Sequence, residues 1–375
     1  MPTDARRPAD IAVTGIGLVT PAGPDAETTW DGLLDGRSVA ARDALLIGLP
    51  VDFSCRVAGF GGQDDERAVR LGLAAAREAV ADAACPGGAG WPGARVAVVL
   101  GHSGGGGAAA DEIATALGAT GPAFVTSAGW ASGATALGVA RDLLRTGACD
   151  VAVAGGAESL RSRAAAAGYG TAGVLSSRTH DPAGASRPFD ADRDGFVLGE
   201  AAGVLVLERR ADARARRARV RALLAGYAAS AEPRRSGAAT AGRAAERAVR
   251  AALADAGLGP EGIDQVSAHG SGVPLEDLAE ARMLRRVFGG TPPPVTALKS
   301  VIGHAAGGSG AVEAACTVLS LVHQAVPPTA NLDRLDPEIE LDVVTKSPRR
   351  RPVRAALCTS LGLTGQNVAL VFRTP

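Results

Sequence analysis

One order of predicted elements occurs twice along the chain, and this repetition restricts the fold more than any other feature. Short apolar runs that predict strands alternate with stretches whose apolar spacing predicts helices. In the first part the predicted strands are 11–14, 96–100, 151–154 and 204–207, and the predicted helices are 65–84 and 131–146. In the second part the predicted strands are 220–226, 266–269, 355–359 and 368–372, and the predicted helices are 242–256, 275–288 and 310–323.

Apolar strands between helices indicate an α/β fold in which a mostly parallel sheet, covered by helices on both faces, is formed twice. The change from one half to the other falls near 209–220. We therefore predict an N-terminal half over residues 1–215 and a C-terminal half over residues 216–375.

Composition and charge exclude several classes of function. The 39 basic and 39 acidic residues balance, so the chain has no electrostatic attraction to nucleic acid or to an anionic membrane. No apolar run is long enough to span a bilayer, and the first residues lack the layout of a signal peptide. The five cysteines are scattered without CxxC spacing, which predicts neither disulfides nor a structural metal site. We expect a cytoplasmic protein whose partner is a metabolite or another protein.

Aromatic residues make up only 3% of the chain, so the core must consist of Ala, Val and Leu, with helices packed closely through small residues. A tryptophan in the interior is therefore informative.

Two glycine-rich segments look like nucleotide-binding loops but lack the defining residues. Gly15 and Gly17 follow a predicted strand, yet the third glycine of a dinucleotide fingerprint is absent. The glycines at 104–107 lack the lysine and Ser/Thr of a phosphate loop, and tight turns explain them better. These segments disfavour a dehydrogenase.

The most specific signal is the order in which several motifs occur. They are GPAFVTSAGWASGATALGVARDLLRTGACDVAVAGGAES, SRPFDADRDGFVLGEAAGVLVLE, SAHGSGVPLEDLAEARMLRRVFG, ALKSVIGHAAGGSGAVEAA, PPTANL and CTSLGLTGQNVALVF. Together they resemble the β-ketoacyl synthases (ketosynthases) of the thiolase superfamily, over residues 11–372. SRPFDADRDGFVLGE and the KS–GH–G segment are the most specific, because each places several unusual residues at set spacings.

The resemblance implies a thiolase-like five-layered αβαβα fold built from two similar halves. It also implies a dimer, either a homodimer or a heterodimer with another ketosynthase-like subunit, in which the GPAFVTSAG strand pairs across the twofold axis. Substrates would be thioesters on the phosphopantetheine arm of an acyl carrier protein, with no further cofactor. The arginine runs at 208–221 and 346–354 are most simply solvated faces, and the alternative is a docking surface for that acidic carrier.

In the family a nucleophilic cysteine stands at the start of a buried helix, and the corresponding residue here is Trp130. An indole is only a hydrogen-bond donor and is no nucleophile near neutral pH, so ordinary acyl-enzyme formation is excluded at this position. The ring should also occupy space that the acyl chain needs. Ser127, Ser132 and Cys358 are possible substitutes, but neither serine has an evident base and Cys358 is better explained as a buried strand residue.

Three residues match the family's other catalytic positions, namely His269, Lys299 and His304, with Glu313 in support. In the family the histidines face the thioester carbonyl and the malonyl carboxylate, and the lysine orients them. Hydrogen-bond donors at a developing oxyanion suffice for decarboxylation, which needs no thiol. The implied oxyanion hole uses the backbone N–H groups of Trp130 and Leu363, and a changed side chain does not remove them.

Other departures from the family concern the acyl channel. Leu361, Leu363 and Thr364 replace its usual gating residues, and segments that wall the channel are missing after the 104–107 glycines and after Tyr227. Two hypotheses follow. The first is a non-elongating enzyme of polyketide or fatty-acid biosynthesis that decarboxylates a carrier-bound malonyl group. The second is a catalytically silent subunit, similar to a chain-length factor, that pairs with an active ketosynthase. The retained histidines favour the first hypothesis.

Overall fold

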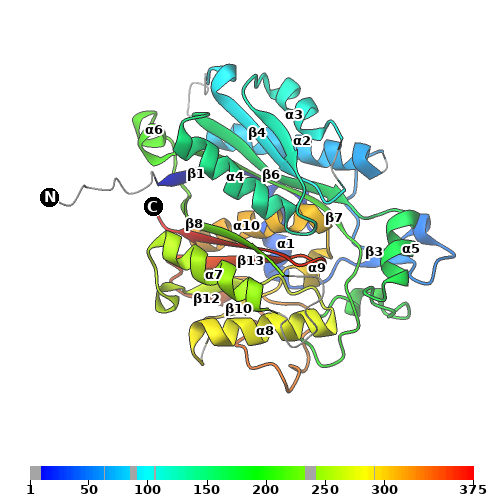
Figure 1. Ribbon diagram of the computed structural model, residues 1–375. Helices are drawn as coiled ribbons and strands as arrows, with labels where there is room; N and C mark the ends of the chain where they lie inside the picture. Colours follow the sequence, from blue (N-terminus) through cyan, green and yellow to red (C-terminus); the bar gives the residue numbers. More distant parts are fainter. Residues whose placement is uncertain (1–9, 63, 85–90, 105–106, 233–241, 291) are drawn as a thin grey trace.

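The computed structural model describes residues 10–375, except 63, 85–90, 105–106, 233–241 and 291 (Figure 1). Within these residues ten of the strands form one sheet. In sheet order they are β10 (Val295–Thr296), β9 (Gln265–Ser267), β13 (Ala355–Leu361), β14 (Gln366–Arg373), β8 (Ala222–Ala231), β1 (Ile11–Val19), β7 (Glu200–Arg209), β6 (Val151–Ser159), β4 (Val96–Gly101) and β5 (Ala123–Thr126). Two short pairs lie apart, β2 (Ala41–Arg42) with β3 (Phe53–Ser54) and β11 (Ala325–Val326) with β12 (Arg349–Arg350).

The sheet consists of two equivalent halves. The order β1-β7-β6-β4-β5 in one half has the same chain topology as β8-β14-β13-β9-β10 in the other. In each half, taken in this order, the first two pairs of neighbouring strands are antiparallel and the last two pairs are parallel. The halves join where residues 11–13 of β1 pair with residues 222–224 of β8. The predicted two similar halves are confirmed.

The expectation of a mostly parallel sheet is wrong for the strands nearest the centre. β13 and β14 are antiparallel because only the short turn at 362–365 connects them, and a parallel pair needs a crossover of a dozen or more residues. β6 and β7 are also antiparallel neighbours, although the long segment 160–199 separates them in the chain.

Helices cover both faces of each half and fill the space between them. They are α1 (Ala26–Asp35), α2 (Asp64–Ala83), α3 (Ala109–Leu117), α4 (Ser132–Thr146), α5 (Arg163–Thr171), α6 (Arg210–Ala215), α7 (Arg243–Ala256), α8 (Pro274–Phe288), α9 (Lys299–Ile302) and α10 (Ala306–His323). Figure 1 shows the layers from top to bottom as α2 and α3, the first half of the sheet, α4 and α10, the second half, and α7 and α8. The five-layered αβαβα arrangement agrees with the expected fold. Among the described helices none is long and apolar enough to cross a membrane.

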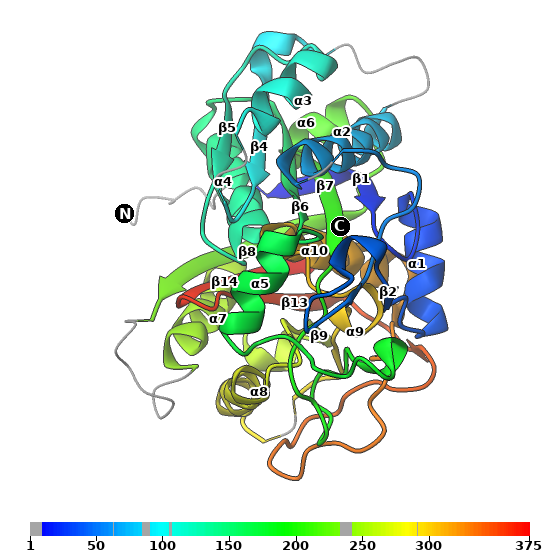
Figure 2. The ribbon, with the colours of Figure 1, turned by 90° about the vertical axis from the view of Figure 1, so that its right-hand side faces the viewer.

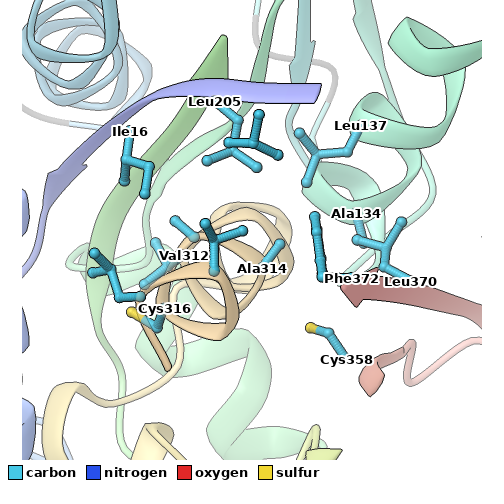
Figure 3. Packing of buried hydrophobic residues seen from close by; sticks show 14 of the residues in the cluster. Ile16, Ala134, Leu137, Leu205, Val312, Ala314, Cys316, Cys358, Leu370 and Phe372 are labelled. Atoms are coloured by element: carbon cyan, nitrogen blue, oxygen red, sulfur yellow. The ribbon is translucent and has the colours of Figure 1, made fainter. Parts of the chain in front are cut away.

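The central helix α10 is buried on every side. All of its residues from Ala306 to Leu321 are buried, as expected for a helix that is apolar all round. Figure 3 shows Val312, Ala314 and Cys316 of this helix inside the core. α4 approaches α10 so closely that a Cβ on Gly133 would lie 2.7 Å from the carbonyl oxygen of Gly307. Small residues thus allow the tight helix packing that the scarcity of aromatic residues predicted.

Glycines explain why two predicted elements are longer in the structure. α10 begins at Ala306 rather than at residue 310, because Gly307 and Gly308, poor helix formers, are held in the helix by their close contacts. β1 continues through Gly15 and Gly17 to Val19, and a Cβ on either glycine would collide with the backbone of α2. These two glycines are packing positions inside a strand, not part of a nucleotide loop. Part of the 104–107 segment lies outside the described residues.

Between β6 and β7 the chain leaves the layers and forms a side segment over residues 160–199, which includes α5. Figure 2 shows α5 in front of the layers. This segment returns to the core at the isolated bridge between Leu198 and His304. It therefore covers the ends of α4 and α10 that meet at the candidate site.

Candidate active site

The structure brings together the residues that the motifs singled out. His269 follows β9, Lys299 begins α9 after β10, and Trp130 follows β5, so each lies beyond the carboxyl end of a parallel strand. His304 lies between α9 and α10. The carboxyl ends of parallel strands are where α/β proteins place their ligands. All four side chains are buried.

Lys299 is the centre of a buried polar network. Its Nζ donates to the carbonyl oxygen of His269 at 2.6 Å, approaches Nδ1 of that ring at 3.3 Å, and forms an ion pair with Glu313 of α10. Burial raises the pKa of Glu313 to about 7, while the Lys299 ammonium opposes the rise. Lys299 therefore holds His269 and α10 in one fixed arrangement.

The hydrogen bonds assign one tautomer to each histidine. A lysine ammonium has only donors, so Nδ1 of His269 accepts from Lys299 and the neutral ring carries its proton on Nε2. His304 accepts at Nδ1 from the backbone N–H of Ala306 at 3.1 Å, and Ser309 lies at 3.1 Å from the same nitrogen. Its proton is therefore also on Nε2. Both rings present an Nε2–H donor to the site.

These two donors are buried and have no hydrogen-bond partner among the described residues. The ring centroids lie 5.2 Å apart. Burial lowers the pKa of both histidines well below the usual value, and the nearby Lys299 charge lowers them further. Both rings are therefore neutral donors at neutral pH, available to an oxygen that gains negative charge.

Trp130 covers the histidines with an aromatic layer. Its ring centroid lies 4.5 Å from that of His304 in an edge contact and 6.0 Å from that of His269, nearly parallel to it. Phe196 packs edge-on at 5.4 Å, and the indole Nε1 donates to the hydroxyl of Tyr169 on α5 at 3.2 Å. Only 3% of the Trp130 surface is exposed, so the ring closes the site in this conformation.

Tyr169 and Phe196 were missed from the sequence, although a weak signal was present. The chain has only two tyrosines and seven phenylalanines, and Phe196 lies within the SRPFDADRDGFVLGE motif. In such a chain each aromatic residue near a motif is a candidate for the site. Their contacts depend on how the 160–199 segment folds back, which no local spacing predicts.

Two buried carboxylates, also missed, hold the backbone around the histidines. Glu280 of α8 accepts from the N–H groups of His269 and Gly270, each at 2.8 Å. Glu158 of β6 accepts from the N–H of Gly307 at 2.6 Å, in the first turn of α10. Burial raises the pKa of Glu280, opposed by these backbone donors. Both residues have a positioning role.

The substitute nucleophiles considered above have other tasks. Ser132 Oγ accepts from the N–H of Ala128 at 2.9 Å and donates to the carbonyl of Gly129, which closes the turn before α4. Ser127 Oγ donates to the carbonyl of Ser103 at 3.1 Å. Cys358 lies buried in β13 (Figure 3), where burial raises the pKa of its thiol. A thiol with a raised pKa is a poor nucleophile.

The turn that contains Leu363 lies beside the start of α4. A Cβ placed on Gly129 would lie 3.3 Å from the Gln366 side chain and 3.6 Å from that of Thr364. Leu363 itself is 43% exposed. In the part of the chain that is described, no cluster of His, Cys, Asp and Glu side chains is suited to a metal ion.

Comparison with known proteins identifies the family of this chain. The sequence profile of the beta-ketoacyl synthase N-terminal domain matches residues 9–46 and 105–213, and that of the C-terminal domain matches residues 221–333. The 3-oxoacyl-[acyl-carrier-protein] synthase 2 of Synechocystis sp. is 34% identical over 415 aligned positions, which cover 97% of each chain. Because this chain has only 375 residues, the relative contains segments that this chain lacks.

Two solved structures have the same fold over almost the whole chain. A type II polyketide ketosynthase in complex with its acyl-carrier protein and bound to a hexaketide aligns with a TM-score of 0.90 and 28% identity, covering 98% of this chain and 100% of that one. The ishigamide ketosynthase/chain length factor aligns with a TM-score of 0.87 and 29% identity, covering 98% and 99%. The two domain matches, the relative and the shared fold show that this chain belongs to the β-ketoacyl synthase family of the thiolase superfamily.

Proposed function

We propose that this protein is a non-elongating ketosynthase homologue that decarboxylates a malonyl thioester carried by an acyl carrier protein. The observation that carries the proposal is the pair of buried, unpartnered Nε2–H donors on His269 and His304, beside a residue that cannot form an acyl-enzyme. Buried donors without partners are costly in a folded protein. A substrate oxygen bound there offsets this cost.

The reaction needs only hydrogen-bond donors. When the bond between the malonyl carboxylate and its α-carbon breaks, carbon dioxide leaves and the electron pair passes into the thioester carbonyl, which becomes an enolate. His269 and His304 donate to that oxygen as its charge grows. The α-carbon then takes a proton from solvent to give the acetyl thioester. Lys299 acts as a positioning residue through its contacts with His269 and Glu313.

The role of Trp130 in this proposal is to exclude the elongation reaction. We infer from the motif that it stands at the position of the family's cysteine, in the turn before α4. Its indole cannot attack a thioester. The backbone N–H groups of Trp130 and Leu363 are the proposed second pair of oxyanion donors. Substrate entry requires the ring to turn away from His304, to which its centroid lies at 4.5 Å.

A second function is favoured by the buried Trp130. In this alternative the protein is a silent subunit that pairs with an active ketosynthase, and the aromatic layer of Trp130, Phe196 and Tyr169 plugs the site. The edge strand β5 supports pairing in either case, as a homodimer or a heterodimer, because it ends the sheet and leaves one side without a partner among the described strands.

Decarboxylation can be tested on a malonyl-loaded type II acyl carrier protein by mass spectrometry of the carrier. We expect conversion of the malonyl to the acetyl form by the wild type, and loss of this activity in His304→Ala. His180→Ala is the matched control, because His180 is an exposed histidine that belongs to neither the candidate site nor its contacts. No turnover by the wild type, together with a stable complex with a separate ketosynthase, would establish the silent subunit instead.

The role of Trp130 is tested by Trp130→Cys. The new thiol would lie at the start of α4, where the helix dipole favours a thiolate. We expect iodoacetamide to label the introduced thiol of this variant and to leave the buried Cys55, Cys149, Cys316 and Cys358 unlabelled. Peptide mapping identifies the labelled residue. A covalent acyl adduct on the unmodified wild type during chain elongation would overturn the proposal.

A further inference from the structure

A cavity of about 640 Å³ lies at the end of α10 opposite to the candidate active site. Its walls come from α1, the last turns of α2 and α10, the segment that leads into β8, and β12. α10 has 18 residues and therefore spans about 27 Å at 1.5 Å per residue. The cavity is separate from the site around His304, and nothing in the proposed reaction uses it.

The floor of the cavity is apolar and contains a flat stacked pair. Trp30 of α1 and the ring of His323 lie 5.3 Å apart between centroids, at an interplanar angle of 20°. Leu34, Leu319 and Val322 line the same floor. A volume of this size and an apolar floor suit a small organic ligand.

One wall of the cavity is formed by three guanidinium groups that come from the two arginine runs noted in the sequence. Arg219 and Arg221 belong to the 208–221 run, and Arg350 belongs to the 346–354 run. Burial lowers the pKa of His323, and the charges of all three arginines lower it further, while Asp31 opposes the shift. The three arginines therefore lie near that ring. The fold thus brings two distant basic segments to one cavity.

These arginines have unused donors. The side chains of Arg219 and Arg350 make no hydrogen bond or ion pair to any described residue. Arg221 forms an ion pair with Asp82, but its Nε is buried and lacks a partner in the described part of the chain. Guanidinium groups bind carboxylate and phosphate oxygens through directed pairs of N–H donors.

The acidic side chains of the cavity do not cancel this wall. Glu78 accepts from the N–H groups of Leu18 and Ala26, each at 2.8 Å, and Asp82 accepts from Ile16 and pairs with Arg221. Glu27 and Asp31 belong to α1 and are exposed to solvent. Because both are exposed, solvent and salt screen their repulsion of an anion bound at the arginines.

We propose that this cavity binds a small organic anion, with an apolar ring over Trp30 and His323 and a carboxylate or phosphate at Arg219, Arg221 and Arg350. The ligand is a metabolite rather than a carrier-bound substrate, because the cavity lies a whole helix length from the site. The proposal does not depend on the proposed decarboxylation, since its test measures binding alone.

The test is isothermal titration calorimetry of the full chain with 2-naphthoate. We expect binding that weakens about tenfold in the double variant Arg219→Gln/Arg350→Gln, as the loss of a charged hydrogen bond predicts. Both residues are exposed, so the variant should fold. Arg214→Gln on α6, an exposed arginine outside the cavity, is the matched control and should bind like the wild type.

Three further probes separate the parts of the proposal. Neutral 2-naphthalenemethanol and cationic 2-naphthylmethylamine should bind about tenfold more weakly than 2-naphthoate, and inorganic phosphate without a ring should not bind measurably. Equal binding of the acid and the alcohol would overturn the role of the arginines. Unchanged naphthoate binding in the double variant would place the ligand elsewhere and overturn the proposal.

Discussion

The two halves of the molecule have the same strand order, yet they supply opposite kinds of wall to the candidate site. The C-terminal half supplies His269, Lys299, His304 and Glu313, a polar wall whose groups are fixed by one another. The N-terminal half supplies Trp130, Tyr169 and Phe196, an aromatic wall that closes over the histidines. A repeated scaffold therefore does not imply repeated chemistry, because the loops after equivalent strands are free to differ.

The difference also separates two sources of stability. The polar wall is stabilised by charge pairing between buried groups, so the removal of one partner leaves an unpaired buried charge. The aromatic wall is stabilised by area removed from water and by ring packing. Substitutions in the two walls should therefore lower the free energy of unfolding by different amounts, and these losses should depend differently on pH.

The largest effect is expected from Lys299→Met, which removes the charge that pairs with Glu313. We expect a loss of about 3–5 kcal/mol in the free energy of unfolding, measured by urea denaturation at pH 8. Because burial raises the pKa of Glu313 to about 7, the loss should be smaller at pH 5, where the carboxyl group is protonated. Lys346→Met, at an exposed lysine, is the control. A loss below about 1 kcal/mol would contradict the polar wall.

Trp130→Ala should cost somewhat less, about 3 kcal/mol, by the same measurement. Deletion of a buried aromatic ring leaves a cavity, but here the cavity adjoins the two Nε2–H donors and water can enter it. Trp91→Ala, at a tryptophan away from the site, serves as the comparison. If Trp130→Ala were more destabilising than Lys299→Met, the aromatic wall would be the main determinant of stability at the site.

The two histidines should make the free energy of unfolding depend on pH. Their folded pKa values lie well below the unfolded value near 6.5, so the unfolded state binds more protons below that pH. Their contribution is complete above pH 6.5 and declines as the pH falls. His304→Asn, whose amide oxygen can replace Nδ1 as acceptor, should reduce the loss of stability between pH 7 and pH 5 by about 2 kcal/mol. An unchanged slope of the free energy of unfolding against pH would show that folding does not lower the pKa of His304.

The smallest effect is expected from Tyr169→Phe, which removes the acceptor of the Trp130 indole. A loss of about 1 kcal/mol in the free energy of unfolding is expected for one partly buried hydrogen bond. The intrinsic fluorescence of the indole should also change. Tyr227→Phe, at the chain's other tyrosine, should leave that signal unaltered.

Much of the polar wall was predictable from the sequence, because its residues lie in motifs with set spacings after strands. His269 ends the predicted strand 266–269, Lys299 and His304 belong to the KS–GH–G motif before the predicted helix 310–323, and the structure places all three together. Tyr169, Glu158 and Glu280 were not predictable, since their contacts depend on the path of the 160–199 segment and on helix packing. The cavity at Trp30 could not be predicted either, because its lining residues come from segments far apart in the chain.

The fully buried α10 has a consequence for how this protein diverges. A helix with no free face accepts few substitutions, since each larger side chain displaces a neighbour on some side. New properties must therefore arise at its two ends, where loops meet it and space remains. One end meets Trp130, which in the proposed function prevents elongation, and the other holds the arginine cavity, so substitutions that change the properties of this protein are expected at the two ends of α10 and not along its length.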